Sequence, residues 1–406
     1  MNQLKNALLC AMLLCAIACK KQTESADQIQ TNSLNQKSKL SVSAATPTVT
    51  IGGSKFYVGG GTKEIFFNGI NTAWQKQADY SLDFLGRNFD ANWWNTEFQR
   101  YNANKINLAR VWIHGGGNYS PSLNGDGMVT GVSAKFWADM DALVVKSRDW
   151  KIYLMPTFWS FDMVKDDKAY YNQYRQIIND VNKTQWYIDN FLIPFINRYK
   201  NEPYVMGYDL CNEPEHMWRD ANCGKLERNN VIRFLSKCAA AVNQNTVKPV
   251  TVGSMWIVFN SDRYINFDTY TGDNRYRGNN YSDASLKAQN GNNANSYLDF
   301  YSPHWYQWQS SDGPFNKSIG FWLDNGSKPA LIGETYGGDV NSSTNLNSPG
   351  WNITMANYYK QSYWNGFAGV CGWKNPWEND GYGSFNGVAS GTNAFHAAYP
   401  NLVFPQ

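Results

Sequence analysis

The chain has 406 residues and a formal net charge of +3, and 16% of its residues are aromatic. So small a charge, with no basic stripe, argues against nucleic acid as a partner and favours a neutral ligand. Only four His are present, without a tight His and Cys cluster, so we expect no metal and no other cofactor.

The segment before Cys19 has the features of an export signal. Lys5 supplies a positive start, an apolar stretch runs from Ala7 to Ala18, and small residues precede Cys19. This pattern predicts a signal peptide over residues 1–18, too short and wrongly flanked to span a membrane. A Cys directly after small residues resembles the lipobox of bacterial lipoproteins. The resemblance implies a lipid on Cys19 and attachment to the outer membrane, on its periplasmic or cell-surface face; a plain cleaved signal and secretion is the alternative.

Residues 19–46 have the composition of a tether. After Cys19 they are rich in Ser, Thr, Gln, Lys and Ala and nearly free of large apolar residues. Such a segment cannot bury enough surface to fold. We expect residues 47–406 to form one domain, because barrels of alternating strands and helices routinely exceed the usual domain size, and we expect a monomer.

Short apolar runs alternate with helix-like stretches from residue 65 onward. Each run is β-branched or aromatic and bounded by turn residues, as is typical of buried parallel strands. The eight runs are Ile65–Asn71, Ile106–Trp112, Lys151–Phe158, Val205–Asn212, Pro249–Ser254, Leu298–Tyr306, Pro329–Glu334 and Gly369–Lys374. Eight units, no Gly-rich phosphate loop and polar residues at several strand ends favour an α/β fold of the (β/α)8 TIM barrel type over an open sheet.

Several intervening segments have helical periodicity. Ser133 is suited to cap a helix, and Pro194 should kink another. The expected helices are Ser133–Trp150, Thr184–Lys200, Leu226–Asn245 and one that begins at Ser348-Pro349.

Two long connections interrupt this alternation. His114–Thr130 is rich in Gly and Asn, and Asp262–Ser296 is dominated by Asn, Gly and Tyr. Both follow strand ends at the face that carries active sites in barrels, and loops of this length are usually functional.

The cysteines beyond residue 46 decide little. Cys211 and Cys371 lie in apolar runs and are expected to be buried thiols. Cys223 and Cys238 could pair in an oxidising compartment, but their spacing does not decide it.

Two carboxylates each follow an apolar strand. Val205–Cys211 leads into Asn212-Glu213-Pro214, and Pro329–Gly333 leads into Glu334. A Glu at a strand end is often just an exposed terminus, but two on the fourth and seventh strands of a barrel would face one cleft. There, burial and neighbouring charges can shift their pKa values.

The tripeptide Asn-Glu-Pro occurs twice, and only one copy lies at the end of a predicted strand. Asn201-Glu202-Pro203 lies before its strand, at the end of the preceding helix and so on the stability face of a barrel. We therefore predict that Glu202 is not catalytic.

The ordered set of strand-end residues resembles glycoside hydrolase family 5, within the clan whose acid/base follows strand four and whose nucleophile follows strand seven. The similarity spans Phe66 to Trp377. The matching positions are Arg110 in Leu108–Trp112, Asn212-Glu213-Pro214, His304 and Tyr306 in Pro303–Tyr306, Glu334 in Ile332–Glu334 and Trp373 in Cys371–Trp373.

The resemblance implies catalytic roles for Glu213 as acid/base and Glu334 as nucleophile, which need to lie ~5–5.5 Å apart in a retaining enzyme. Arg110 would hold Glu334 charged through a bidentate contact, and Tyr306 would donate a hydrogen bond to it. Asn212 would bind the sugar 2-OH.

The resemblance also implies a −1 subsite lined by His304 and floored by Trp373. A core imidazole or a core indole is the competing interpretation of each. Trp74 and His114 are expected to reach the cleft as further substrate-binding residues, although the Gly run after His114 leaves its direction open. Other candidates for subsites, about half of which should be core, are Trp112, Trp159, Trp305, Trp308 and Trp377.

These observations predict a retaining glycoside hydrolase that cleaves a neutral β-1,4-linked polysaccharide, with β-mannan favoured over β-glucan. An endo-β-1,4-glucanase and an exo-β-glycosidase are the alternatives within this class. A non-catalytic, glycan-binding surface lipoprotein is the alternative from another class, and it would be expected to lack one of the two carboxylates.

Overall fold

The computed structural model describes residues 47–76, 82–261, 263, 278–309, 313–323, 327–340, 352–375 and 381–405. The predicted signal peptide, Cys19, the tether, Trp377 and the predicted helix start at Ser348 lie outside the described residues.

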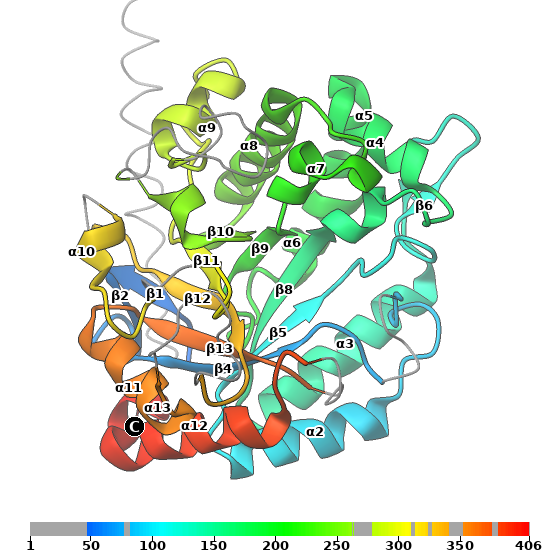
Figure 1. The fold of residues 1–406 in the computed structure, drawn as a ribbon. Coiled ribbons are helices and arrows are strands. Elements are labelled where there is room, and N and C mark those ends of the chain that lie inside the picture. Colours follow the sequence, from blue (N-terminus) through cyan, green and yellow to red (C-terminus); the bar gives the residue numbers. More distant parts are fainter. Residues whose placement is uncertain are drawn as a thin grey trace, which may run out of the picture. The chain divides into compact units, whose positions relative to one another are not determined.

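Eight parallel strands close into a barrel in which each strand pairs with its neighbours in the sequence (Figure 1). Each of the eight predicted runs overlaps one of these strands, and the predicted TIM barrel is confirmed. The barrel strands are β4 (Phe67–Thr72), β5 (Leu108–Trp112), β8 (Tyr153–Ser160), β9 (Tyr208–Asn212), β10 (Val250–Ser254), β11 (Ser302–Trp305), β12 (Leu331–Tyr336) and β13 (Gly369–Trp373).

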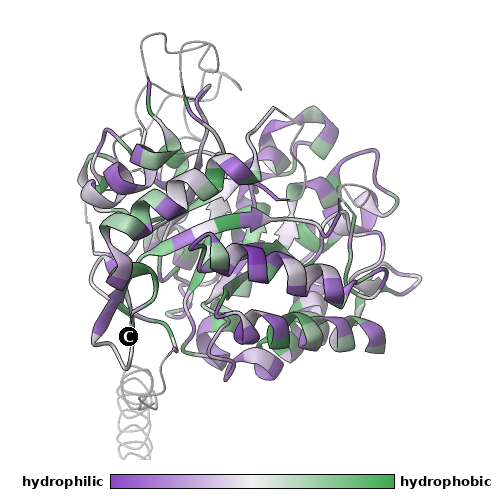
Figure 2. Ribbon diagram, turned by 90° about the horizontal axis from the view of Figure 1, so that it is seen from below, coloured by the Kyte–Doolittle hydropathy of each residue, from purple (hydrophilic) through white to green (hydrophobic). Residues whose placement is uncertain are grey.

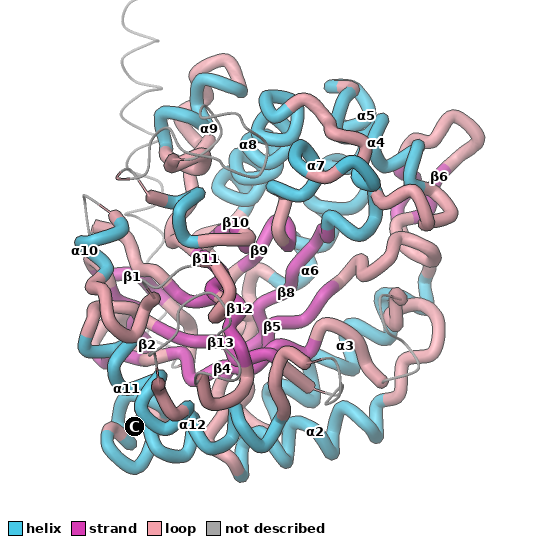
Figure 3. The backbone as a smooth tube through the Cα atoms, in the orientation of Figure 1, coloured by secondary structure: helices cyan, strands magenta, loops and turns pink. Residues whose placement is uncertain are grey.

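Helices surround the strands, and Figure 3 shows the strands gathered at the centre of the helices. Hydrophilic and hydrophobic residues alternate along these helices (Figure 2), as expected where one helix face packs on a barrel. The α-helices are α2 (Ala91–Ala103), α3 (Ala134–Asp149), α4 (Tyr171–Asn179), α5 (Val181–Tyr187), α6 (Ile193–Tyr199), α7 (Glu215–Arg219), α8 (Arg228–Asn245), α9 (Asp283–Gln289), α10 (Ile319–Trp322), α11 (Met355–Trp364), α12 (Phe385–Ala398) and α13 (Pro400–Val403). Short 3₁₀ turns are η2 (Phe161–Val164), η4 (Ala221–Cys223) and η5 (Ile257–Asn260).

Two of the predicted helices, α3 and α8, form close to their expected bounds. The Ser133 hydroxyl accepts from the backbone N–H of Phe136 and caps α3. The predicted Thr184–Lys200 helix is interrupted by a π turn, η3 (Ile188–Leu192), directly before the segment that contains Pro194. The helical backbone continues from η3 into α6, so Pro194, which has no N–H, lies just after the π turn.

A small antiparallel sheet that the sequence did not predict closes the amino-terminal end of the barrel. It consists of β1 (Thr50–Gly52), β2 (Lys55–Val58) and β3 (Lys63–Ile65). Phe56 is fully buried and belongs to one apolar cluster with Phe67, Leu108 and Leu331 at the starts of the barrel strands. The carboxyl-terminal segment lies at the same end, where the Leu402 carbonyl accepts from the N–H of Phe66 at 2.7 Å.

The Gly-rich loop after β5 is organised around one buried carboxylate, Asp83. One oxygen of Asp83 accepts from the backbone N–H groups of Gly115, Gly116 and Gly117, at 2.7–3.2 Å. The other accepts from Tyr119 and Ser120. The Gly run therefore wraps a carboxylate closely, and the loop goes on to a two-stranded sheet of β6 (Ser122–Leu123) and β7 (Val129–Gly131).

The four cysteines that the structure describes, Cys211, Cys223, Cys238 and Cys371, are all buried free thiols. Burial of Cys211 and Cys371 is thus confirmed, and Cys223 and Cys238 do not pair. Within the described part of the chain, no helix is both long and apolar enough to span a bilayer.

Candidate active site

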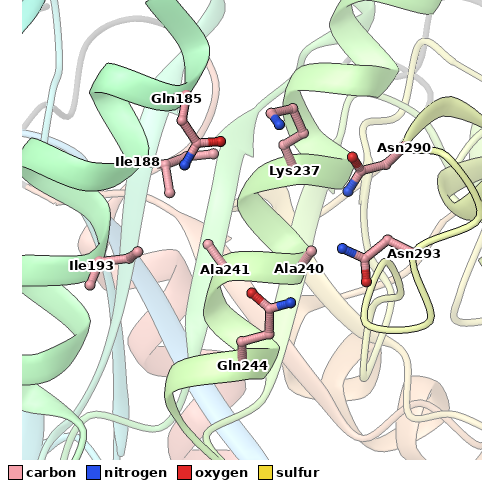
Figure 4. A pocket seen from close by; sticks show the side chains of 9 residues that line it. All are labelled: Gln185, Ile188, Ile193, Lys237, Ala240, Ala241, Gln244, Asn290 and Asn293. Atoms are coloured by element: carbon pink, nitrogen blue, oxygen red, sulfur yellow. The ribbon is translucent and has the colours of Figure 1, made fainter. Parts of the chain in front are cut away.

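A cavity of about 300 Å³ opens where the barrel strands end, and both predicted catalytic carboxylates line it. The lining residues are Trp74, Trp112, Phe161, Asp162, Lys165, Asn212, Glu213, His216, Met255, Tyr306, Trp308, Gln309, Glu334, Trp373 and Tyr382. A smaller hollow of about 120 Å³ lies on the helical exterior, between α5, α8 and the segment after α9 (Figure 4). None of the predicted site residues lines that second hollow.

Glu213 follows β9 in a strained backbone conformation. Its φ of +46° lies in the left-handed region, which costs free energy for a residue with a side chain. Its N–H donates to the carbonyl of Gly253. One oxygen, Oε1, lies 2.9 Å from Nδ1 of His304, and the other, Oε2, lies 3.3 Å from Nε2 of His216. Burial acts to raise the pKa of Glu213, but these two imidazoles hold it well below its usual range.

Glu334 ends the apolar part of β12 and faces Glu213. Tyr306 donates to Oε2 of Glu334 at 3.0 Å, and Arg110 donates to Oε1 at 2.7 Å. Burial raises the pKa of Glu334 above its ordinary value, although His304, Arg110 and Tyr306 oppose the rise. An oxygen of Glu213 and an oxygen of Glu334 lie within 4.8 Å of each other. This spacing suits nucleophile and acid/base on one sugar ring better than two carboxylates with a water between them.

Arg110 holds Glu334 by one hydrogen bond, and the predicted bidentate contact is made with Asp209 instead. Nε and Nη2 of Arg110 both donate to Oδ2 of Asp209, at 2.9 and 2.8 Å. Nη1 also donates to Asn71, and Nη2 to Asn212. Arg110 was also expected to lower the pKa of Glu334. The pKa is raised instead, because the effect of burial is larger than the opposing effect of the Arg110 charge.

His304 lies beneath the two carboxylates and does not line the cavity, so its predicted place in the wall of the subsite is wrong. Its side chain is 0% exposed, and Nδ1 lies 2.9 Å from Glu213 and 3.5 Å from Glu334. His304 and Glu334 are register partners on β11 and β12. The imidazole therefore supports both acids from below. It has room because residue 253 is Gly: a Cβ there would lie 3.1 Å from Nε2 of His304 and 2.7 Å from Nη2 of Arg110.

Two curated proteins with the same name are similar to the chain in sequence. No family model matches the sequence. The chain is 26% identical over 355 residues to a mannan endo-1,4-beta-mannosidase of Cryptopygus antarcticus, covering 79% of this chain and 83% of that protein. A protein of the same name from Mytilus edulis is 28% identical over 342 residues, covering 76% and 83%.

Solved structures agree on the fold. The crystal structure of the beta-1,4-D-mannanase from Cryptopygus antarcticus has a TM-score of 0.71 at 23% identity, covering 86% of this chain and 94% of that one. A glycoside hydrolase family 5 mannosidase from Rhizomucor miehei has a TM-score of 0.50 at 12% identity, covering 86% and 97%. These likenesses confirm the (β/α)8 barrel fold.

An aromatic wall, consistent with the family 5 resemblance, encloses one side of the cavity. Trp74, Trp112 and Trp373 meet edge to face or tilted, with centroids 5.5–6.2 Å apart, and pack with Tyr306 in one cluster. The predicted floor, Trp373, and the predicted subsite residue Trp74 both line the cavity.

Farther from the carboxylates, Trp308 stacks on Tyr306 with 4.5 Å between centroids and is 40% exposed. Of the other Trp candidates, Trp112 also lines the cavity, whereas Trp159 and Trp305 are fully buried in the core. Of these four described Trp candidates, two line the cavity and two lie in the core, as expected.

His114 lies outside the family 5-like site, and its assignment as a substrate-binding residue is wrong. Its ring packs against Phe191, with centroids 4.4 Å apart, and Nδ1 lies 2.8 Å from the hydroxyl of Ser120. Burial lowers the pKa of His114 to about 3, so the ring is a neutral core residue. Asp83 binds the loop that follows His114, and the His114 side chain points toward Phe191 in the helical layer and away from the cavity.

The two copies of Asn-Glu-Pro are separated as predicted. Asn212 lines the cavity and accepts from Arg110. Glu202 lies before β9 and is 3.4 Å from Arg148 at the end of α3, away from the cavity lining. Position relative to the strand thus distinguishes the two Glu residues.

Sequence reasoning missed three ionisable residues of the site. Asp209 is a carboxylate inside an otherwise apolar strand, and that anomaly could have identified it. His216 follows Glu213 by three residues on the short helix α7, where i,i+3 spacing brings two side chains together. Lys165, which pairs with Asp162 at the cavity rim, gave no signal in the sequence.

Proposed function

We propose that the chain is a retaining endo-β-1,4-mannanase of the glycoside hydrolase family 5 type. The observation that carries the proposal is the approach of Glu213 and Glu334 to within 4.8 Å at the mouth of the barrel. That distance allows the two groups to act on one glycosidic bond without an intervening water.

The hydrogen bonds to Glu334, and not the pKa shifts of the two carboxylates, support the assignment of their roles. Glu334 accepts from Arg110 and Tyr306, which orient an ionised carboxylate for attack on the anomeric carbon. Glu213 donates a proton to the leaving oxygen as the C–O bond breaks, and a glycosyl ester forms on Glu334. Glu213 then takes a proton from water, and the resulting hydroxide nucleophile cleaves the ester and restores Glu334.

β-Mannan is the favoured substrate because both curated relatives are mannan endo-1,4-beta-mannosidases. The cavity is also suited to a neutral chain. Aromatic rings supply apolar faces for sugar C–H groups, and the exposed Trp308 extends this surface away from the carboxylates.

The test compares β-mannan, carboxymethyl cellulose and mixed-linkage β-glucan under identical conditions. We expect turnover of mannan to oligosaccharides of several lengths, with the β-anomer formed first, as proton NMR would record. Release of a single small sugar from chain ends would indicate an exo enzyme. Glu334→Ala should abolish hydrolysis and retain mannan binding, and unchanged hydrolysis would refute the assignment.

We propose further that the protein is exported and lipid-anchored through Cys19, as the sequence before the domain indicates. Labelling with a palmitate analogue in a bacterial host, followed by membrane fractionation, tests this. Wild-type protein should carry label and sediment with outer membranes. Cys19→Ala should carry none, and label on that variant would contradict the assignment.

A further inference from the structure

Glu213 is held on both oxygens by imidazoles, and one of these belongs to a chain of three groups. Nε2 of His216 lies 3.3 Å from Oε2 of Glu213, and Nδ1 lies 2.6 Å from Oδ2 of Asp220. The ring also packs on Phe161, with centroids 4.2 Å apart. A carboxylate only accepts, so Asp220 fixes the Nδ1–H of His216 and leaves Nε2 aimed at Glu213.

This arrangement conflicts with the simplest form of acid catalysis. A general acid must carry a proton when substrate binds, and a carboxyl in this position is usually kept protonated by its surroundings. Here the opposite holds, because His216 and His304 lower the pKa of Glu213 despite its burial. Burial also opposes charge on His216, but hydrogen bonds to Asp220 and Glu213 outweigh it and raise the pKa of His216 to about 10.

We propose that Glu213 and His216 share one proton across the Oε2 to Nε2 contact, and that His216, oriented by Asp220, is the positioning residue that stores this proton for the acid/base. The inference rests on the proposed function, since it assigns the source of the proton that Glu213 delivers. The pair titrates as a unit, as strongly interacting groups do.

The proton balance closes over one turnover. At rest, His216 is an imidazolium and Glu213 a carboxylate. As substrate binds, the proton moves from Nε2 to Glu213, which leaves a neutral imidazole whose Nδ1–H stays on Asp220. Glu213 passes that proton to the leaving oxygen. In the second half-reaction Glu213 takes a proton from water, and the pair returns to its starting charge.

The other charged and titratable groups around His216 are engaged elsewhere. From η2, Asp162 pairs with Lys165 at 2.5 Å. From β11, His304 lies on the other oxygen of Glu213, and from η4 the neighbouring group is the buried thiol of Cys223. On α8, Arg228 and Arg233 donate to Asn280 and to backbone carbonyls, respectively. Glu213 and Asp220 are thus the groups that control the proton on His216.

Nitrogen-15 NMR of histidine-labelled protein tests the proposal without any substrate. The chain has only four His, so His216→Gln assigns the signals by difference. We expect both ring nitrogens of His216 to stay protonated through neutral pH and to titrate well above the ordinary imidazole value of about 6.5. Titration of His216 near that ordinary value would overturn the proposal.

Kinetics supply the second test. His216→Gln keeps a donor toward Glu213 but cannot store a proton, so the alkaline limb of kcat/KM on mannan should move to lower pH by roughly one to three units. Asp220→Asn should move it in the same direction by less. The loss in His216→Gln should be smaller on a nitrophenyl β-mannoside, whose leaving group needs little protonation. His396→Gln, on the distant helix α12, is the matched control and should leave the profile unchanged.

The outcomes separate the two claims. Wild-type protein that does not cleave mannan would sink the proposed function, while the NMR titration would still decide on the shared proton. Wild-type protein that cleaves mannan, together with a His216→Gln variant whose alkaline limb stays in place, would overturn the inference alone.

Discussion

Arg110 and Asp209 form a fully buried ion pair in which two guanidinium nitrogens, Nε and Nη2, donate to the same carboxylate oxygen, at 2.9 and 2.8 Å. The remaining oxygen of Asp209 accepts from the backbone N–H of Gly253. Asp209 therefore anchors the guanidinium inside the barrel, and Nη1 is left to reach Glu334. The orientation of the nucleophile depends on a carboxylate that lies below it and outside the cavity lining.

Asp209→Asn should be strongly destabilising, because it leaves a buried guanidinium without its main counter-charge. Breaking a buried pair of this kind costs about 3–5 kcal/mol. Chemical denaturation should show that loss in the free energy of unfolding, and kcat should fall as Arg110 loses its orientation. Glu64→Gln removes a half-exposed pair with Lys55 as the control and should cost about 0–1 kcal/mol. A variant as stable as wild type would contradict the role given to Asp209.

Tyr306→Phe should move the acid limb of kcat/KM to higher pH. Tyr306 donates to Glu334 and lowers its pKa, so removal of the hydroxyl raises a pKa that burial has already raised. Glu334 must be ionised to attack, and a higher pKa means that activity appears only at higher pH. The shift should be roughly one to two units, since a hydrogen bond to a charged group contributes about 1.5–3 kcal/mol.

The control for this measurement is Tyr174→Phe, which removes a buried hydroxyl that donates to the carbonyl of Gly117, away from the carboxylates. Its acid limb should coincide with that of wild type. A coincident limb for Tyr306→Phe as well would remove Tyr306 from the support of the nucleophile.

Azide should restore turnover of an activated aryl β-mannoside in both carboxylate variants. The glycosyl azide products of the two variants should have opposite anomeric configurations. In Glu334→Ala, azide occupies the place of the nucleophile and displaces the aryl group once, which gives an α-glycosyl azide. In Glu213→Ala, the ester on Glu334 still forms, and azide then releases it as the β-glycosyl azide. Proton NMR of the products distinguishes the anomers. The same anomer from both variants would mean that the two roles are wrongly assigned.

Trp308→Ala should weaken the use of polymer more than that of a small substrate. Trp308 stacks on Tyr306 and is 40% exposed at the cavity edge. Loss of one stacking ring should raise KM for mannan roughly 2- to 12-fold, equivalent to about 0.5–1.5 kcal/mol. Trp364→Ala is the matched control, because Trp364 is 63% exposed at the end of α11 and lines no part of the cavity. An equal rise in KM for mannan in both variants would exclude a specific sugar-stacking role for Trp308.

The barrel and its two catalytic candidates could be predicted because their signals are local. Each strand is a short apolar run, and Glu213 and Glu334 stand at the ends of two of them. The separation of Glu213 from Glu202 required only the order of strand and tripeptide. These features can be read from the sequence without knowing which helix packs on which strand.

The remaining errors have tertiary causes. His114 was placed in the cleft because it follows β5, but Asp83, far away in the sequence, binds the Gly run and turns the ring into the core. The resemblance implied a bidentate contact between Arg110 and Glu334, but only one hydrogen bond forms because Asp209 on β9 accepts from Nε and Nη2. The sheet of β1–β3 escaped prediction because its strands are three or four residues long and lie among glycines.

The sheet β1–β3 and the helix α13 put both ends of the domain at one pole of the barrel. Tyr153, at the start of β8, donates to the carbonyl of Pro47, and Leu402 lies against Phe66 at the same pole. The cavity opens at the other pole. A solid support or a fusion partner joined directly at either end of the described domain is therefore attached at the pole opposite to the cavity. A long, insoluble polysaccharide can approach the mouth head-on, and immobilisation through either end should cost little activity on bulk substrate.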